Sequence, residues 1–231
     1  MAAPDSHPLT PPAHHRQALL ATAGSANATR GELVRLELTP MGWARRGAPV
    51  PVCFGACGFG WGDGEHPPAL AAYPGAPHKR EGDGRSPIGW YRLGTVFGTQ
   101  APPGCRMPYR PTTPRDFWVD DPRAPDYNRW VTLPDGADPS ARWASFERMR
   151  RDDGQYRLGV VVEHNTGPVT PGHGSAIFLH VHKAPDHPTH GCTAMDYAAL
   201  LEIVQWLDPE AAPLLIQGPS PLPEQWPGGR P

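Results

Sequence analysis

The sequence has no strong net charge, no long apolar run and no recognisable export signal. Its 21 Lys and Arg residues against 23 Asp and Glu residues give a formal net charge of −2. A chain so close to neutral lacks the broad cationic field that non-specific nucleic-acid binding requires. No stretch approaches the roughly 18 consecutive apolar residues of a transmembrane helix. Residues 1–30 lack the basic start and apolar run of a secretory signal peptide, so we predict that they form a flexible leader.

Cysteine is scarce, and its spacing does not predict a disulfide framework. The four residues Cys53, Cys57, Cys105 and Cys192 allow three two-disulfide pairings, among which the sequence does not choose. Cys53 and Cys57 belong to a predicted strand, where their Cα atoms would lie roughly 13 Å apart. A disulfide requires about 4.4–6.8 Å between these atoms. We therefore interpret three of the cysteines as buried, inert thiols and one as special.

Proline and glycine are abundant, and they confine regular structure to short segments. The chain has 32 Pro and 26 Gly, together with 8 Trp, 6 Tyr and 6 Phe that can build a core. Periodicity predicts helices over residues 140–150 and 193–207. Apolar patterns predict strands over residues 31–38, 50–57, 90–93, 117–119, 129–133, 158–163, 175–182 and 214–217. In the first strand, Val34, Leu36 and Leu38 share a face. The sequence thus predicts a mainly β domain over residues 31–217 with two or so helices, followed by a disordered tail over 218–231.

Residues 177–207 carry the strongest chemical signal in the sequence. Thr193–Asp196 fits a capping pattern in which a threonine begins a helix and an acidic residue follows three positions later. Cys192 would then lie just before the helix, where free backbone N–H groups and the helix dipole stabilise a negative charge. A thiolate is such a charge, and so is the oxyanion of a tetrahedral intermediate. Gly191 would let the backbone approach a substrate closely, and Cys192 is therefore a candidate nucleophile.

A nucleophilic cysteine needs a base, and two histidines precede it on one predicted strand. His180 and His182 lie two strand steps apart, roughly 6.6 Å, on the same face. The loop that follows is long enough to return Cys192 beside that face. Spacing alone does not choose between the histidines, and the apolar residues before His180 favour it as the more buried and better oriented of the two.

These segments resemble the catalytic domain of the L,D-transpeptidase (YkuD-like) family. The family pattern is a strand histidine, then S/T-x-G-C, then a helix, and the corresponding runs here are Gly174–Val181 and Thr189–Met195. Glu81–Gly89 resembles the family's loop before a strand, and Trp118–Pro122 with Tyr127–Asn128 resembles its middle region. The resemblance covers about residues 80–216, and it implies a β-rich domain that works in the periplasm or elsewhere in the extracytoplasmic cell envelope.

The resemblance also implies a reaction on peptidoglycan stem peptides, without a cofactor or a metal. Cys192 corresponds to the nucleophile, which attacks the amide after the L-centre of a meso-diaminopimelate-type residue and forms a thioester. The amine of a second stem peptide, or water, resolves that thioester. His180 corresponds to the general base, and the N–H groups of Gly191 and Cys192, with His190 beside them, correspond to the oxyanion hole. The residues implied to bind substrate are Thr189, His182, Tyr127 and Asn128.

Two departures from the family pattern and two other functions stay open. Many members have Arg or Asn two residues after the cysteine, where this chain has Ala194, and the spacing from His180 to Cys192 is shorter than in better-known members. A zinc-dependent peptidase or amidase is one alternative, because several metal-ligand types lie within thirteen residues: His180, His182, His187, His190 and Cys192. A non-catalytic cell-wall-binding domain is the other, because the eight Trp suit stacking on sugars.

Overall fold

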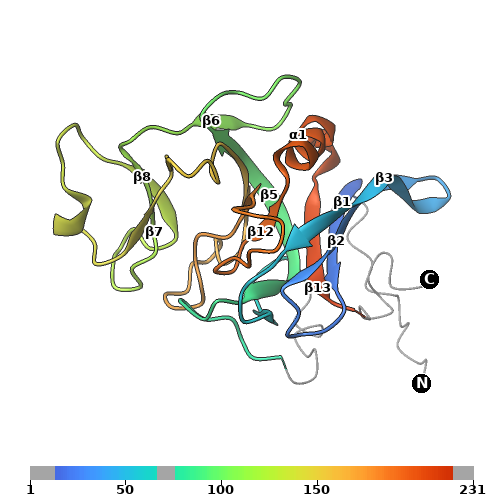
Figure 1. Cartoon of the computed structure of the whole chain (residues 1–231), viewed down its shortest axis with the longest axis horizontal. Helices are drawn as coiled ribbons and strands as arrows, with labels where there is room; N and C mark the ends of the chain where they lie inside the picture. The colour runs from blue at the N-terminus through green and yellow to red at the C-terminus, as the bar shows by residue number, and fades with distance from the viewer. Residues whose placement is uncertain (1–13, 67–75, 221–231) are drawn as a thin grey trace, which may run out of the picture.

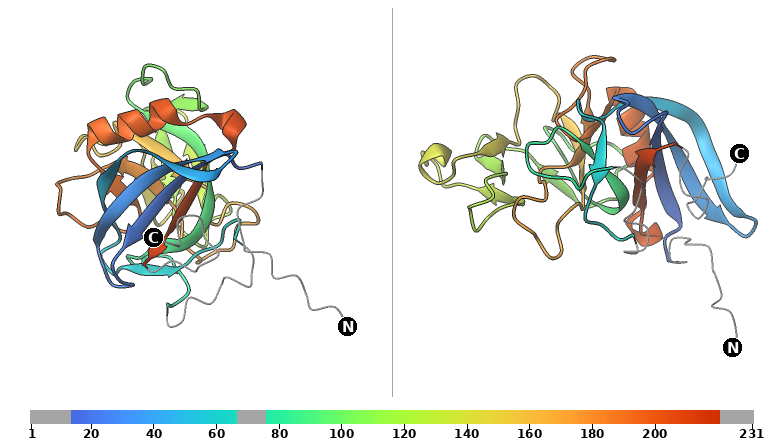
Figure 2. Two further views of the ribbon diagram at one scale, coloured as in Figure 1. Left: turned by 90° about the vertical axis from the view of Figure 1, so that its right-hand side faces the viewer. Right: turned by 90° about the horizontal axis from the view of Figure 1, so that it is seen from below.

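The computed structural model describes residues 14–66 and 76–220, and its main feature is a ten-stranded sheet (Figure 1). Neighbouring strands follow the order β10-β11-β12-β3-β2-β1-β13-β5-β4, with β6 paired to β5. Because β10 also pairs with β5, the sheet closes on itself, and Figure 2 shows its strands curving around a common core. The strands are β1 (Gln17–Ala23), β2 (Arg30–Thr39), β3 (Gly42–Cys53), β4 (Phe59–Trp61), β5 (Ser86–Gly98), β6 (Tyr109–Pro111), β10 (Leu158–Val162), β11 (Phe178–Val181), β12 (Thr193–Met195) and β13 (Leu214–Pro219). The expected mainly β fold is confirmed.

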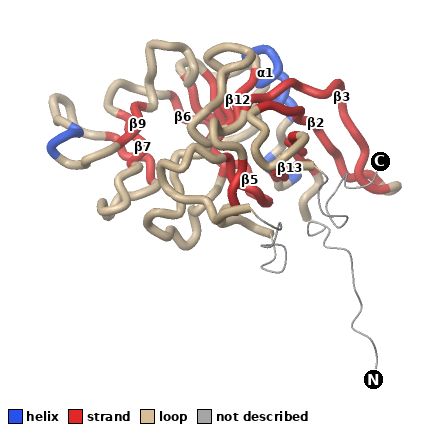
Figure 3. The backbone as a smooth tube through the Cα atoms, turned by 60° about the horizontal axis from the view of Figure 1, so that its bottom comes forward, coloured by secondary structure: helices blue, strands red, loops and turns tan. Residues whose placement is uncertain are grey.

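A smaller sheet, with the strand order β8-β7-β9, projects to one side of the main sheet (Figures 1 and 3). It consists of β7 (Asp116–Val119), β8 (Arg129–Thr132) and β9 (Phe146–Arg148). The residues of its own core are Phe117, Val119, Leu133 and Trp143. A second aromatic cluster joins it to the main sheet, where the Trp118 and Tyr156 rings meet Phe178 edge to face at 5.0 and 5.6 Å. This cluster fixes β7, and with it the paired strand β9, relative to β11.

The part of the chain that the structure describes contains one α-helix, α1 (Tyr197–Trp206), which crosses the main sheet in Figure 2. Its buried residues Leu200, Ile203 and Val204 join the main core. The helix predicted over residues 193–207 is correct from Tyr197 onward only. Asp196 caps it, since its side chain accepts a 2.7 Å hydrogen bond from the backbone N–H of Ala198. The preceding residues instead form β12, because parallel pairing with β11 satisfies their backbone groups.

The helix predicted over residues 140–150 is wrong. This segment contains one turn of 3-10 helix, η2 (Pro139–Ala141), and then β9, whose Phe146 pairs with Val119 of β7. Phe146 and Trp143 do pack on a common partner, Phe117, with ring centroids 5.3 and 6.1 Å away. Their spacing therefore reflects packing against the small sheet rather than one face of a helix. A second 3-10 turn, η3 (Pro209–Ala211), precedes β13.

The flexible leader predicted over residues 1–30 is wrong for its second half. Strand β1 is buried along almost its whole length and lies between antiparallel β2 and parallel β13. Both of its faces are covered, so its short run of small and apolar residues shows no alternation. Residues 1–13, and residues 221–231 of the predicted tail, lie outside the described residues. The domain reaches beyond the predicted boundary, since β13 extends to Pro219.

The two-residue alternation predicted for β2 is kept. Its register against β1 is continuous, and where its pairing with β3 shifts between Leu33 and Arg35 the extra residues belong to β3. Leu36 is buried in the main core and half-buried Val34 packs against the same core, as their predicted shared face requires. Leu33, on the opposite face, is buried as well.

Candidate active site

Cys192 stands at the end of the loop from β11, directly before β12. The helix dipole expected here is absent, because α1 begins only at Tyr197, after a complete strand. Two hydrogen bonds hold the sulfur instead. The backbone N–H of Phe178 donates to Sγ at 3.3 Å, and the thiol donates to the carbonyl of Ala176 at 3.3 Å. The chain that enters β11 therefore sets the position of the thiol.

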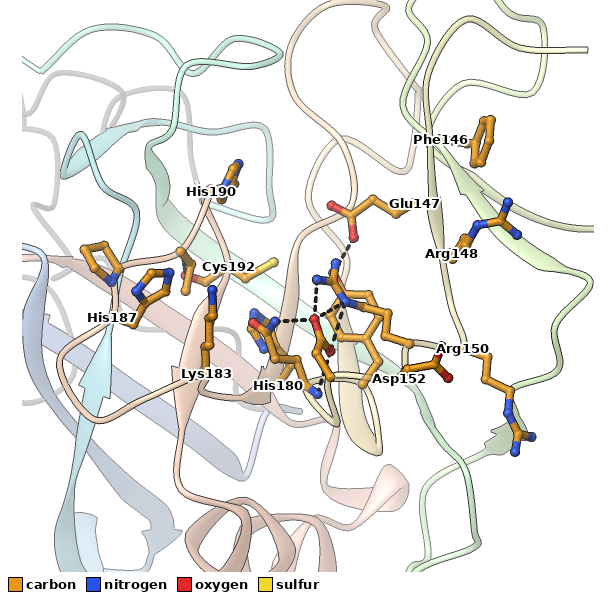
Figure 4. A pocket seen from close by; sticks show the side chains of 16 residues that line it. Phe146, Glu147, Arg148, Arg150, Asp152, His180, Lys183, His187, His190 and Cys192 are labelled. Carbon is orange, nitrogen blue, oxygen red and sulfur yellow. Dashed lines mark hydrogen bonds and ion pairs between the residues drawn. The ribbon is translucent and has the colours of Figure 1, made fainter. Parts of the chain in front are cut away.

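Cys192 lines a cavity of about 660 Å³ between the main sheet and β9 (Figure 4). Only 7% of the residue is exposed, and Figure 4 shows its sulfur pointing into the cavity. The walls come from the segment 146–156, from His180 with Lys183, and from the loop 187–192. A cavity of this size admits a peptide segment or a small molecule. The nearly buried thiol is thus reached from one side only.

His180 lies on β11 and faces the same cavity. Its Nδ1 makes a 2.8 Å hydrogen bond to the carbonyl of Val181, an acceptor, so Nδ1 carries the proton of the neutral ring. The lone pair of Nε2 is then the basic site of the imidazole. The Tyr156 ring packs edge-on against His180 with centroids 5.4 Å apart. Burial lowers the pKa of His180 to about 4, and the Val181 hydrogen bond only partly opposes this.

The environment of Cys192 keeps its thiol protonated at rest. Burial raises the pKa of Cys192 to about 12, and the carboxylate of Glu147 adds to the rise. The Phe178 N–H and the cations Lys79 and Arg151 oppose it to a lesser degree. Since the pKa of His180 is lowered to about 4, both groups are neutral at neutral pH. Within the described residues no hydrogen bond joins them.

The loop before Cys192 is fixed by two hydroxyl groups. Thr189 Oγ1 donates to the Cys192 carbonyl at 2.7 Å and accepts the Gly191 N–H at 3.1 Å, while Ser86 Oγ donates to the same carbonyl at 3.2 Å. Gly191 has a φ of +144°, and a Cβ there would lie 2.9 Å from the carbonyl oxygen of Arg85. Only glycine fits this position without strain. Its N–H is engaged, so the expected pair of oxyanion-hole donors is not formed in this state.

Three of the residues predicted to bind substrate do not line the cavity. His182 lies beyond β11, and its backbone N–H donates to Met195 at 2.8 Å. Tyr127 and Asn128 are 2% and 5% exposed and support the chain that leads into β11. The Tyr127 hydroxyl accepts the Gly174 N–H at 3.1 Å, and Asn128 Oδ1 accepts the Ala176 N–H at 3.2 Å. These two residues hold the carbonyl that binds the thiol rather than contacting the cavity.

Of the other predicted residues, Thr189, His190 and Cys192 line the cavity with His180, whereas Gly191 lies buried behind its wall. Sequence reasoning missed the opposite wall. Its chief members are Glu147, Arg151 and Tyr156, with Lys183 at the rim. No local pattern marks these residues, because strand pairing and aromatic packing bring the segment 146–156 to the thiol.

The structure gives no support to a zinc site or a disulfide framework. Among residues 14–66 and 76–220, no three His, Cys, Asp or Glu side chains gather in a geometry that could hold a metal ion. His182 does not share the cavity with His187 and His190, which are both exposed. All four cysteines are free thiols. Cys57 is exposed and Cys105 is half-buried, so the interpretation of three buried, inert thiols is wrong for these two residues.

Comparison with known proteins identifies the domain. The model of the family described as L,D-transpeptidase catalytic domain matches residues 39–216. No curated protein and no solved structure matches the chain. The matched segment runs from the end of β2 into β13, and it contains His180, Cys192 and the segment that faces them. The chain therefore belongs to the L,D-transpeptidase catalytic domain family.

Proposed function

We propose that this domain is a cysteine acyltransferase that acts on the stem peptides of peptidoglycan. The observation that carries the proposal is the convergence of Cys192 and His180 on one cavity, in a chain whose family consists of peptidoglycan L,D-transpeptidases. A thiol that is accessible from one side and lies beside a neutral imidazole supplies a nucleophile and a base. Nothing in the arrangement requires a cofactor.

The first half of the reaction acylates the enzyme. His180 Nε2 takes the proton of the thiol as Sγ bonds to the carbonyl carbon that follows the L-centre of the donor stem residue. The tetrahedral intermediate then collapses, the C–N bond breaks, and the imidazolium returns the proton to the departing amine. The thioester on Cys192 is resolved by the amine of a second stem peptide or by water, with His180 again moving the proton.

Cys192 and His180 are both neutral at rest, and this determines how acylation begins. A buried thiol with a pKa near 12 is not a stored thiolate, so deprotonation accompanies attack. The thiol must first leave the Ala176 carbonyl, to which it donates at 3.3 Å. Rotation about the Cα–Cβ bond of Cys192 achieves this. An incoming amide carbonyl displaces that hydrogen bond and brings the sulfur toward His180.

The developing oxyanion needs donors close to the sulfur. In the described residues, the Cys192 N–H donates to no acceptor and is the donor that we assign to the oxyanion. The Gly191 N–H donates to the Thr189 hydroxyl at 3.1 Å. It can therefore donate to the oxyanion only if that hydroxyl rotates away. His190 is exposed at the cavity and is placed to bind the substrate beside it.

The cavity rim suits a substrate that carries carboxylates. Lys183 is exposed and lines it, whereas the guanidinium of Arg148 lies over Phe117 and that of Arg150 donates to the Thr112 carbonyl. Ala194, which replaces the Arg or Asn of many family members, is 1% exposed on β12 and does not line the cavity. We propose that Lys183 takes over recognition of a donor carboxylate. The family works outside the cytoplasm, and we propose the same for this chain. Among its described helices, none has the length and apolar character needed to span a membrane.

Intact-mass analysis after incubation with a tetrapeptide stem or a carbapenem tests the proposal. We expect one covalent adduct, mapped by peptide analysis to Cys192 and lost in Cys192→Ala. The matched control is Cys57→Ala, which removes an exposed thiol outside the cavity and keeps the adduct. An adduct on Cys57, or none on Cys192, would refute the assignment.

A further inference from the structure

Glu147 faces the thiol from the opposite wall of the cavity. Figure 4 shows the Glu147 carboxylate and the Cys192 sulfur directed toward the same space. The two groups are near enough to interact electrostatically, and so are Glu147 and His190. Glu147 is half-buried on β9, an element that belongs to the small sheet rather than to the sheet that carries Cys192. A carboxylate next to a thiol hinders thiolate formation, so its presence calls for another role.

The two carboxylate oxygens of Glu147 differ: Oε2 is held by a hydrogen bond, and Oε1 is available to a ligand. The Tyr156 hydroxyl donates to Oε2, and the Tyr156 ring is held by Phe178 and His180. Across the described residues no further hydrogen bond reaches Glu147. Oε1 does not belong to the fully buried polar atoms that lack a partner, so it keeps some exposure. Oε1 is therefore a hydrogen-bond acceptor that remains open to the cavity and is aimed by a rigid aromatic neighbour.

The other charges of the cavity do not compete for this role. Arg151 donates three hydrogen bonds to the carboxylate of Asp153, from Nε at 3.0 and 3.2 Å and from Nη2 at 2.5 Å. Asp152 is exposed, and in Figure 4 its carboxylate points away from Cys192. Arg151 is near enough to stabilise the charge of Glu147, but its ion pair is with Asp153. Among the described residues, Glu147 is thus the lining carboxylate that is turned to the thiol and forms no direct ion pair. A cation that enters beside the thioester meets it first.

We propose that Glu147 binds the ammonium group of the acyl acceptor and takes its proton, so that transfer to an amine is favoured over hydrolysis. This inference rests on the proposed function and concerns only its second half. The acceptor gives one ammonium proton to Glu147 and becomes a free amine. Its nitrogen bonds to the thioester carbonyl carbon as the C–S bond breaks, and a second proton passes through His180 to the departing sulfur. The products are an amide, the Cys192 thiol, neutral His180 and protonated Glu147, which returns its proton to water.

Burial supports the proton-accepting part of this role. It raises the pKa of Glu147 above its ordinary value, and the Tyr156 hydrogen bond opposes the rise. A carboxylate with a raised pKa is a stronger base toward an ammonium ion than an exposed one. Water brings no positive charge to Glu147, so the carboxylate discriminates between the two fates of the thioester.

The test measures how the acyl-enzyme divides between transfer to an amine and hydrolysis. Enzyme acylated by a stem-peptide donor is offered either an amine-bearing stem peptide or hydroxylamine, which is uncharged at the assay pH, and the ratio of transfer to hydrolysis is read by mass spectrometry. For Glu147→Gln we expect the ratio to fall about tenfold or more with the ammonium acceptor and to stay unchanged with hydroxylamine, as loss of one charge-assisted contact implies. For Glu147→Asp, which keeps the carboxylate, the ratio with the ammonium acceptor should lie between those of the wild type and Glu147→Gln.

Asp152→Asn is the matched control, because it removes an acidic group from the same cavity without facing the thiol. We expect it to keep the wild-type ratio. The ratio is counted per acyl-enzyme, so it does not depend on how much of a variant folds. An unchanged ratio in Glu147→Gln, an equal fall with both acceptors, or an equal fall in Asp152→Asn would overturn the inference. Failure of the wild-type enzyme to form any acyl-enzyme would instead overturn the proposed function, and the inference with it.

Discussion

Replacing Asn128 tests whether this residue supports the site or binds substrate. Its side chain makes four buried hydrogen bonds: Oδ1 accepts from Trp118 Nε1 at 2.9 Å and from Ala176 N at 3.2 Å, and Nδ2 donates to the carbonyls of His164 and Asn165 at 3.0 and 2.8 Å. The backbone of Asn128 has a φ of 56°, in the left-handed region. Asn128→Ala removes all four bonds and leaves their partners buried.

The expected loss of stability follows from these bonds. A buried hydrogen bond contributes roughly 0.5–1.5 kcal/mol net, so the four together contribute about 2–6 kcal/mol. Alanine tolerates the left-handed backbone less well than asparagine, which adds about 1 kcal/mol. We expect Asn128→Ala to lower the free energy of unfolding by about 3–7 kcal/mol. This is a large part of the roughly 5–15 kcal/mol by which most domains are stable.

Urea unfolding followed by tryptophan fluorescence measures this loss. Asn128→Gly should recover about 1 kcal/mol relative to Asn128→Ala, because glycine removes the backbone strain but not the lost hydrogen bonds. Asn27→Ala, at an exposed position in a turn, is the control and should change stability by less than about 1 kcal/mol. If Asn128→Ala unfolds like the wild type and only raises KM for the stem peptide, Asn128 binds substrate and the structural role is wrong.

Three further predictions concern the reacting groups. His180→Ala should slow acylation by about 100-fold or more and His182→Ala by less than about threefold, as measured by single-turnover mass spectrometry; equal losses would contradict the choice of base. Because the pKa of His180 is about 4, acylation should rise with pH through this value and stay level from about pH 5 to 8, whereas a midpoint near 6.5 would show an unburied imidazole. In the free enzyme, alkylation of Cys192 by iodoacetamide should rise about tenfold per pH unit beyond neutral, with exposed Cys57 as reference, and a plateau near neutral pH would reveal a resting thiolate.

The neutral thiol–imidazole pair changes how the site is understood. The sequence places Cys192 before a predicted helix, which favours a stored thiolate. The structure puts β12 there instead, and the hydrogen bonds to Phe178 and Ala176 replace the helix dipole. Under the proposed function, such a site reacts when a substrate enters and displaces water, rather than through a thiolate that is present beforehand.

The sequence by itself determined the parts of the site that are close together along the chain. His180 and Cys192 belong to one strand–loop–strand unit, so the motif Thr189–Cys192 and the strand before it were enough to predict that these two residues line one cavity. The same alternation placed His182 on that face, where the structure does not have it. The mainly β class followed from short apolar runs between prolines and glycines, because such runs favour strands wherever they are covered. The sequence also predicted the strands that show alternation or a continuous apolar run, because these patterns are local.

Only the tertiary structure decided what surrounds that unit. Thr193–Met195 has a helical capping pattern but forms β12, because hydrogen bonds to β11 satisfy its backbone. Strand β1 is recognisable only between β2 and β13, and its partners come from opposite ends of the chain. Glu147 reaches the thiol because β9 pairs with β7 and because Tyr156 packs on β11. Each of these outcomes depends on partners distant in sequence, and local patterns carry no information about which distant segments will pair.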